Sequence, residues 1–151
     1  INLYFNQQNS KNAQSNSTRA QVLSTLTTFL TAIASVSLIV GAVGIANTMF
    51  TAVLEKTKEI GIMKAIGAKN KDILLIFLLN SALIGFAGGI LGVGVGYLLA
   101  YILTSAGLVT IISISTVMIT LLISIAVGII SGLIPAINAS KLDPVEALRR
   151  D

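Results

Sequence analysis

The sequence predicts an all-α integral membrane protein with three transmembrane helices. Only 11% of the 151 residues are charged, 54% are hydrophobic, and the mean hydropathy is +0.91. The few charges leave two long uncharged runs, residues 20–54 and 73–140. Because a transmembrane helix needs about 20 consecutive apolar residues, these two runs have room for three spans.

Missing residue types narrow the function. The sequence has no cysteine and no histidine, which excludes disulfides and thiol chemistry and removes the usual general base and the commonest metal ligand. Neither uncharged run contains an acid or a base, which argues against an intramembrane proton relay or protease. The composition therefore predicts a non-catalytic chain without a metal site. The net charge is +4, and 14 of the 16 charged residues lie in two short segments, residues 55–72 and 140–151, a pattern of membrane orientation rather than of nucleic-acid binding.

The first 19 residues are rich in asparagine, glutamine and serine. Such a composition cannot build a core of its own, so we expect residues 1–19 to be a remnant of an extracytoplasmic domain or a linker. Residues 1–5 could form the last strand of that domain. Since the first residue is isoleucine, further sequence is expected upstream.

The first span is expected at residues 27–54, with a helical extension before it. Apolar side chains recur at heptad spacing through this otherwise polar extension, which predicts a seam that packs on another helix. The seam residues are Val22, Leu26, Phe29, Ile33 and Val36. A helix over the whole uncharged run would be about 52 Å long, against a ~30 Å hydrocarbon core. Its length favours an extracytoplasmic stalk over the alternative, a long span with a polar start.

The second and third spans are expected at residues 73–103 and 116–139. Asn70 is a candidate N-cap for the second span, and Pro135 is expected to kink the third span or to end it early. Asn47 and Asn80 each lie eight residues from the charged loop, and we expect both to form interhelical hydrogen bonds.

Glycines four residues apart predict where helices approach each other closely. This set comprises Gly85, Gly88, Gly89, Gly92, Gly96, Gly128 and Gly132. Static packing is the simpler interpretation, and an interface that moves is the alternative.

The positive charges predict the orientation. Five lysines lie in residues 55–72, one lysine and two arginines lie in the tail at residues 140–151, and residues 104–115 carry no charge. Because positive loops stay in the cytoplasm, the N-terminus is expected outside and the C-terminus inside the cytoplasmic membrane.

Residues 55–72 are expected to form a short amphipathic helix between the first two spans. One side of it contains Glu59, Ile62, Met63 and Ile66. Another side is a stripe of small residues beside a lysine, formed by Lys58, Gly61, Ala65 and Ala68. Gly67 is suited to end the helix in a left-handed cap. The helix could lie on a lipid surface, but the small stripe favours a protein surface pressed against it.

Three segments carry a resemblance to a known family: VGAVGIANTMF, EKTKEIGIMKAIGAK and LIPAINASKLDPVEALRRD. Together they resemble the membrane subunit of MacB/FtsX-type ABC transporters, whose members include the lipoprotein-releasing LolC and LolE permeases. The resemblance runs from about Leu26 to the C-terminus. It implies that residues 20–151 are the C-terminal part of an FtsX-like permease, preceded in the family by one span and a large extracytoplasmic domain.

The resemblance also implies partners and a mechanism. Two permease copies, identical or related, would pair with cytoplasmic ATPase subunits that bind ATP and magnesium, and ATP hydrolysis would move the parts outside the membrane (mechanotransmission). The result would be export or extraction of a peptide, a lipoprotein or a small hydrophobic substrate. The alternative is a regulatory scaffold that controls an extracytoplasmic partner and transports nothing. The sequence has no phosphate-binding loop of its own.

Two segments match the cytoplasmic parts of the family. The residues implied to dock on the ATPase are Glu55, Lys56, Lys58, Glu59, Ile60, Gly61, Lys64, Ala65, Gly67 and Ala68. The tail at 142–149 matches the family's end. Its pattern predicts a short helix with Asp143 as N-cap, Pro144 in the first position and Glu146 completing a capping box.

Overall fold

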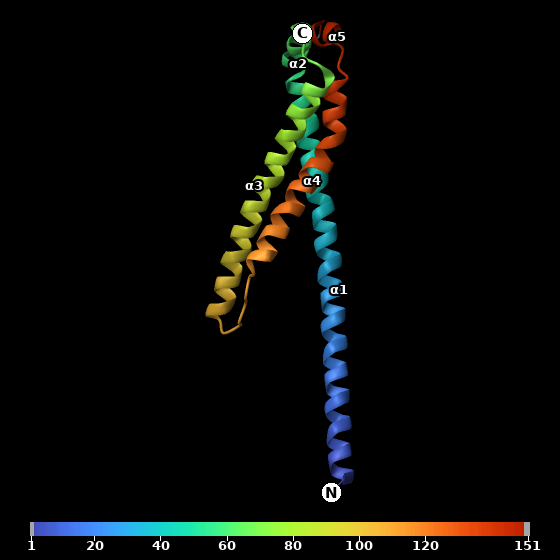
Figure 1. Cartoon of the computed structure of the whole chain (residues 1–151), viewed down its shortest axis with the longest axis vertical. Coiled ribbons are helices and arrows are strands. Elements are labelled where there is room, and N and C mark those ends of the chain that lie inside the picture. Colours follow the sequence, from blue (N-terminus) through green and yellow to red (C-terminus); the bar gives the residue numbers. More distant parts are fainter. Residues whose placement is uncertain (1, 150–151) are drawn as a thin grey trace. The chain divides into compact units, whose positions relative to one another are not determined.

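The computed structural model describes residues 2–149, and for residues 146, 148 and 149 only the backbone. Five helices make up this part of the chain: α1 (Asn2–Glu55), α2 (Thr57–Ala65), α3 (Asn70–Ser105), α4 (Ile114–Ser140) and α5 (Pro144–Arg149) (Figure 1). Residues 2–149 contain no strand, so the all-α prediction is confirmed. The chain divides into two units, which meet between Val40 and Gly41.

Three of the helices can cross a membrane. α1, α3 and α4 are each long and apolar enough to do so. The spans predicted at residues 27–54, 73–103 and 116–139 each lie inside one of these helices, so three candidate spans are found as expected, and the residues at which they enter and leave the membrane stay a prediction.

The first unit is a single helix, the part of α1 up to Val40. The strand considered for residues 1–5 is wrong for residues 2–5, which are helical, while Ile1 lies outside the described residues. Hydroxyl groups of this polar stretch donate to carbonyls one turn back, as from Thr18 to Gln14 (2.9 Å) and from Thr28 to Ser24 (2.9 Å). These local bonds satisfy the side chains inside the helix. Extending an existing helix by one residue is also far easier than starting a new one.

The core of the second unit gathers at one end of its long helices, next to the short helices α2 and α5. The buried core consists of Met49, Val53, Ile60, Ile73, Phe77, Ala136 and Ala139. It therefore combines the end of α1, the middle of α2, the start of α3 and the end of α4. Pro135 is also buried there, inside a helix that continues to Ser140. Of the two expected effects of this proline, an early end of the span is wrong, and a kink stays a prediction. Burial of the last turn in this core holds α4 helical beyond the proline.

α3 and α4 lie side by side and antiparallel through small residues (Figure 1). Ser81 lies against Gly132, Gly85 against Gly128, and Gly89 against Ser124. A Cβ atom added to Gly85 would lie 2.5 Å from the Ser124 carbonyl oxygen, so only glycine fits there without a shift. The Ser124 hydroxyl donates a hydrogen bond of 2.6 Å to the Gly85 carbonyl. α3 and α4 thus form one tightly packed hairpin.

Helix ends follow local signals with one exception. Gly67, with a φ of +109°, follows the C-cap of α2 as predicted. The backbone N–H of Val145 donates to the Asp143 carboxylate (2.9 Å), which confirms the predicted cap of α5, whereas the Glu146 side chain lies outside the described residues. The predicted N-cap Asn70 is wrong by one residue. Lys69 precedes α3, and its N–H donates to the carboxylate of Asp72 (2.9 Å).

Candidate functional site

α2 is the short helix predicted between the first two spans. It follows α1 after a break at Lys56, whose backbone has φ −94° and ψ 8°. The hydrogen bonds nevertheless continue across the break, from Lys56 N–H to the Ala52 carbonyl (3.0 Å) and from Ile60 N–H to the Lys56 carbonyl (2.9 Å). On its other side, α2 packs against α5. The helix is therefore held by both neighbours and presents only one face outward.

The inner face of α2 belongs to the chain's own core. Ile60 is fully buried and Gly61 is buried beside it, while Ala68 packs against the core from the following turn. The predicted stripe of small residues is thus divided, because only Lys58 and Ala65 of the stripe are exposed. Gly61 is thus already buried within this chain, and its expected contact with a partner stays a prediction.

The outer face of α2 combines apolar and charged side chains. Ile66 is 82% exposed and Ile62 is 49% exposed, and Lys58, Glu59 and Ala65 are exposed with them. The Lys56 ammonium lies 3.7 Å from the Glu59 carboxylate, but both side chains are exposed. Such a surface pair adds little stability. The two isoleucines are the exceptional feature of this face.

Lys64 was expected among the partner contacts, but it bonds within the chain. Its ammonium donates to the carbonyl of Ser140 (2.6 Å) and to that of Leu142 (2.7 Å). A cation at the C-terminal end of α4 also favours the negative end of the helix dipole. Sequence reasoning could not find this contact, because backbone carbonyls leave no residue signal.

The remaining predicted docking residues lie around the outer face. Glu55 and Gly67 are exposed at the two ends of α2. Among residues 2–149, no group of three or more carboxylate side chains lies close enough together to hold a metal ion.

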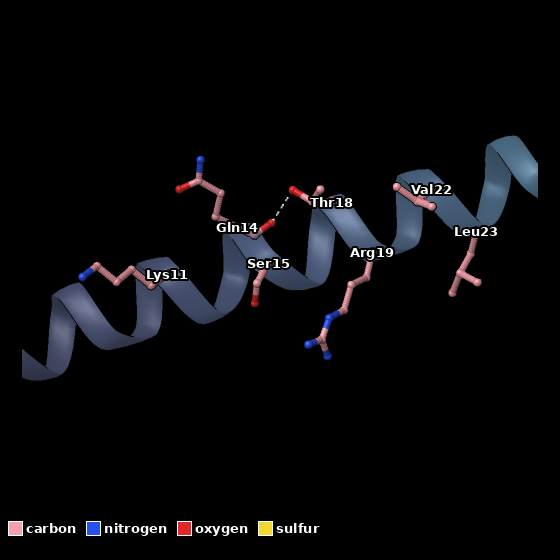
Figure 2. A pocket seen from close by; sticks show the side chains of 7 residues that line it. All are labelled: Lys11, Gln14, Ser15, Thr18, Arg19, Val22 and Leu23. Carbon is pink, nitrogen blue, oxygen red and sulfur yellow. Dashed lines mark hydrogen bonds between the residues drawn. The ribbon is translucent and has the colours of Figure 1, made fainter.

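The seam residues of α1 are exposed. Val22, Leu26, Phe29, Ile33 and Val36 are between 53% and 70% exposed. The unit up to Val40 holds no second helix, so the seam's partner stays a prediction. A shallow hollow nearby is lined by side chains of this same helix, from Lys11 to Leu23 (Figure 2). A single helix cannot enclose a ligand, and we assign no binding site there.

The glycines predicted to pack against another helix fall into two groups, those in contact with a neighbouring helix and those without a neighbour in the described residues. Gly85, Gly89, Gly128 and Gly132 meet across α3 and α4, whereas a Cβ atom on Gly88, Gly92 or Gly96 would have nothing within 4 Å. The side chains of Asn47 and Asn80 are exposed and form no hydrogen bond within the described residues. The interhelical bonds expected for these two asparagines are therefore not made inside this chain.

Comparison with known proteins gives consistent similarities. Residues 31–144 match the family model described as FtsX-like permease C-terminal. The chain is 43% identical over 129 residues to the macrolide export ATP-binding/permease protein MacB of Vibrio parahaemolyticus, covering 84% of this chain and 20% of that protein. It is also 43% identical over 143 residues to an uncharacterized ABC transporter permease of Methanocaldococcus jannaschii, covering 87% of this chain and 35% of the relative. A Bacillus subtilis ABC transporter permease, likewise uncharacterized, is 42% identical over 130 residues, or 85% of this chain and 33% of its own length. The chain thus spans between a fifth and about a third of these relatives.

Proposed function

Because the chain belongs to the FtsX-like permease family of ABC transporters, we propose that it couples ATP hydrolysis in a cytoplasmic partner to movement outside the membrane. The protein is a membrane protein, as its permease relatives and its three apolar helices indicate. The proposed output is the export or extraction of a peptide, a lipoprotein or a small hydrophobic substrate. ATP and magnesium belong to the partner ATPase or to an ATPase portion outside this sequence, as in the relative named an ATP-binding/permease protein.

The outer face of α2 is the observation that carries this proposal. Its inner face is anchored in the core by Ile60, so the exposed Ile62 and Ile66 project from a fixed helix. Apolar side chains on a rigid helix can fill pockets of a partner at little entropic cost. Lys58 and Glu59 flank them and supply the polar rim that protein interfaces use. We assign this face to the docking of the ATPase.

The proposed orientation is consistent with the same assignment. By the positive-inside rule, the lysines of residues 55–72 and the basic residues of the tail favour a cytoplasmic location for α2 and α5, where the ATPase would be. The N-terminal part of α1 would then stand outside the membrane as a stalk. Its exposed seam fits a helix of a second permease copy or of the portion upstream, and a dimer of permeases is part of the proposal.

The test is recovery of the ATPase with variants of this face. The full permease, purified with its ATPase from membranes, should lose most of the ATPase when Ile66→Asp or Ile62→Asp is introduced. A buried apolar anchor at an interface is typically worth about 2 kcal/mol or more, which corresponds to roughly a 30-fold loss of affinity at about 1.4 kcal/mol per tenfold. Ile66→Leu is the matched control and should retain the ATPase.

Correct insertion has to be shown for each variant. The sequence has no cysteine, so single cysteines at Lys69 and Ser105 can be labelled without background. They should react from opposite faces of the membrane. Full recovery of the ATPase with both inserted aspartate variants would refute the docking assignment, and labelling of both cysteines from one face would refute the orientation.

A further inference from the structure

Lys64 joins two helices that lie far apart in the sequence. Its ammonium is within 2.6 Å of the Ser140 carbonyl oxygen and 2.7 Å of the Leu142 carbonyl oxygen, which lie 76 and 78 residues further along the chain. The side chain is partly buried, and Ser140 is only 7% exposed. This contact is therefore part of the packed end of the second unit rather than a solvated surface pair.

The two carbonyls lie at the C-terminal end of α4 and just beyond it, where the helical backbone hydrogen bonds end. The backbone N–H of Lys141 reaches the carbonyls of Ile137 and Asn138, and that of Leu142 reaches Ala139. Among the described residues other than 146, 148 and 149, no backbone N–H donates to the carbonyl of Ser140 or of Leu142. A buried carbonyl without a donor is costly, and Lys64 supplies the donors for both.

α2 is thereby attached both to α1 and to the end of α4. Toward the N-terminus it joins α1 across the break at Lys56, where the Thr57 hydroxyl donates to the Val53 carbonyl (2.9 Å). Through Lys64 it is attached to the end of α4, which is packed tightly on α3 through Gly85 and Gly128. The Lys64 contact adds a polar link between α2 and the end of α4 to the core contacts of Ile60 and to the short connection at residues 66–69 that joins α2 to α3.

We propose that Lys64 is a positioning residue that fixes α2 against the end of α4, so that movement of α2 is delivered in full to the α3–α4 hairpin. This role rests on the proposed function, because the movement of α2 comes from the docked ATPase. Lys64 itself lies behind the outer face and does not touch the ATPase. Its loss should leave docking intact and weaken transmission to the hairpin.

The experiment uses the permease–ATPase complex in lipid nanodiscs. Lys64→Met removes the ammonium and keeps the apolar stem, Lys64→Arg keeps a cationic donor, and Lys141→Met is the matched control on a neighbouring exposed lysine. A cysteine at Ser113, in the connection between α3 and α4, reports on the hairpin. Its labelling rate is compared with and without ATP, and a cysteine at Ser37 reports on α1.

We expect Lys64→Met to retain the ATPase and to show a clearly smaller ATP-dependent change at Ser113, while the change at Ser37 remains. Hydrogen exchange of the backbone of residues 140–147 should become about tenfold faster or more, since hydrogen bonds to a charged group are lost. Lys64→Arg should largely keep the ATP-dependent change at Ser113 and the slow hydrogen exchange of residues 140–147. Lys141→Met should behave as the unmodified protein.

Two results would overturn the proposal. The first is an unchanged ATP response at Ser113 in Lys64→Met, or no ATP response there in the unmodified complex. The second is a joint loss of ATPase binding and thermal stability in both Lys64 variants, which would make the residue purely structural. Failure of the ATPase to co-purify with the unmodified permease is a separate outcome that contradicts the proposed function instead.

Discussion

α3 carries two sets of glycines with the same spacing and opposite surroundings. Gly85 and Gly89 lie against α4, where an added methyl group would meet atoms of Ser124 at 2.5 to 3.0 Å. Gly88, Gly92 and Gly96 lie on the same helix, and a methyl group on any of them would meet nothing within 4 Å. Spacing alone therefore shows where a helix can approach closely, and it does not show which helix does.

The difference lies in what the neighbouring helix offers. The small residues of α4 lie directly opposite small residues of α3. Gly128 faces Gly85, and Gly132 faces Ser81. Between helices in lipid, attraction comes from close packing and from hydrogen bonds rather than from the hydrophobic effect. The Ser124 hydroxyl bond to the Gly85 carbonyl (2.6 Å) is possible only at this short separation. Small residues at matching positions on both helices therefore determine that α3 packs against α4 through Gly85 and not through Gly88.

The most direct test makes the same glycine-to-alanine substitution once in each of the two sets of glycines. Gly85→Ala should destabilise the purified permease by about 1–3 kcal/mol, because the new methyl group would press on the backbone of α4. The clash involves the Ser124 carbonyl at 2.5 Å and the Gly128 Cα at 3.2 Å, which cannot move as a side-chain tip could. Thermal unfolding in detergent measures the difference.

Gly92→Ala is the control for this test. In open space, alanine favours a helix over glycine by up to about 1 kcal/mol, so stability should be unchanged or slightly higher. Equal destabilisation by both substitutions would refute the comparison. A loss seen with Gly92→Ala only in the assembled complex would show that a partner's helix lies on the open set.

A smaller effect is expected where the obstacle is a side chain. The methyl group of Gly132→Ala would overlap the side chain of Ser81, so we expect a loss toward the lower end of about 1–3 kcal/mol. Adding Ser81→Gly should recover part of it, with a coupling of about 0.5–3 kcal/mol in a double-mutant cycle. Strict additivity of the two substitutions would mean that these residues do not touch.

The smallest effect is expected for the hydrogen bond between the helices. Ser124→Ala removes the donor to the Gly85 carbonyl and should lower the unfolding free energy by about 0.6 kcal/mol, the average for such bonds in membrane proteins. Ser131→Ala is the matched control, because its hydroxyl donates only to Val127 of its own helix (2.7 Å). If the two variants lose equal stability, the bond across the helices contributes nothing beyond local effects.

Features with a local cause were predictable from the sequence. The three spans follow from runs of uncharged residues, the end of α2 from the positive φ that Gly67 tolerates, and the start of α5 from Asp143 and Pro144. Each depends on a few neighbouring residues. The sequence also predicted that glycines in α3 and α4 would pack closely, but the choice of Gly85 over Gly88 requires the position of a second helix.

Features that depend on distant segments were not predictable. Gly61 belongs to a stripe of small residues that is continuous in the sequence pattern, yet it is buried while Lys58 and Ala65 of the same stripe are exposed. Lys64 bonds to backbone carbonyls, which every residue has. The polar residues 2–19 have no apolar pattern, and their helical structure follows from continuity with the rest of α1 and from local hydroxyl bonds such as that of Thr18.

The connection between α3 and α4 has a consequence for biogenesis. Not one of the 68 residues from Ile73 to Ser140 is charged, including those of the turn around Gly107. Moving a single charged side chain into the bilayer centre costs about 2.5–3.5 kcal/mol on insertion scales. The α3–α4 hairpin can therefore enter the membrane as one piece, with its serines and glycines already paired, and without help from a separately translocated loop.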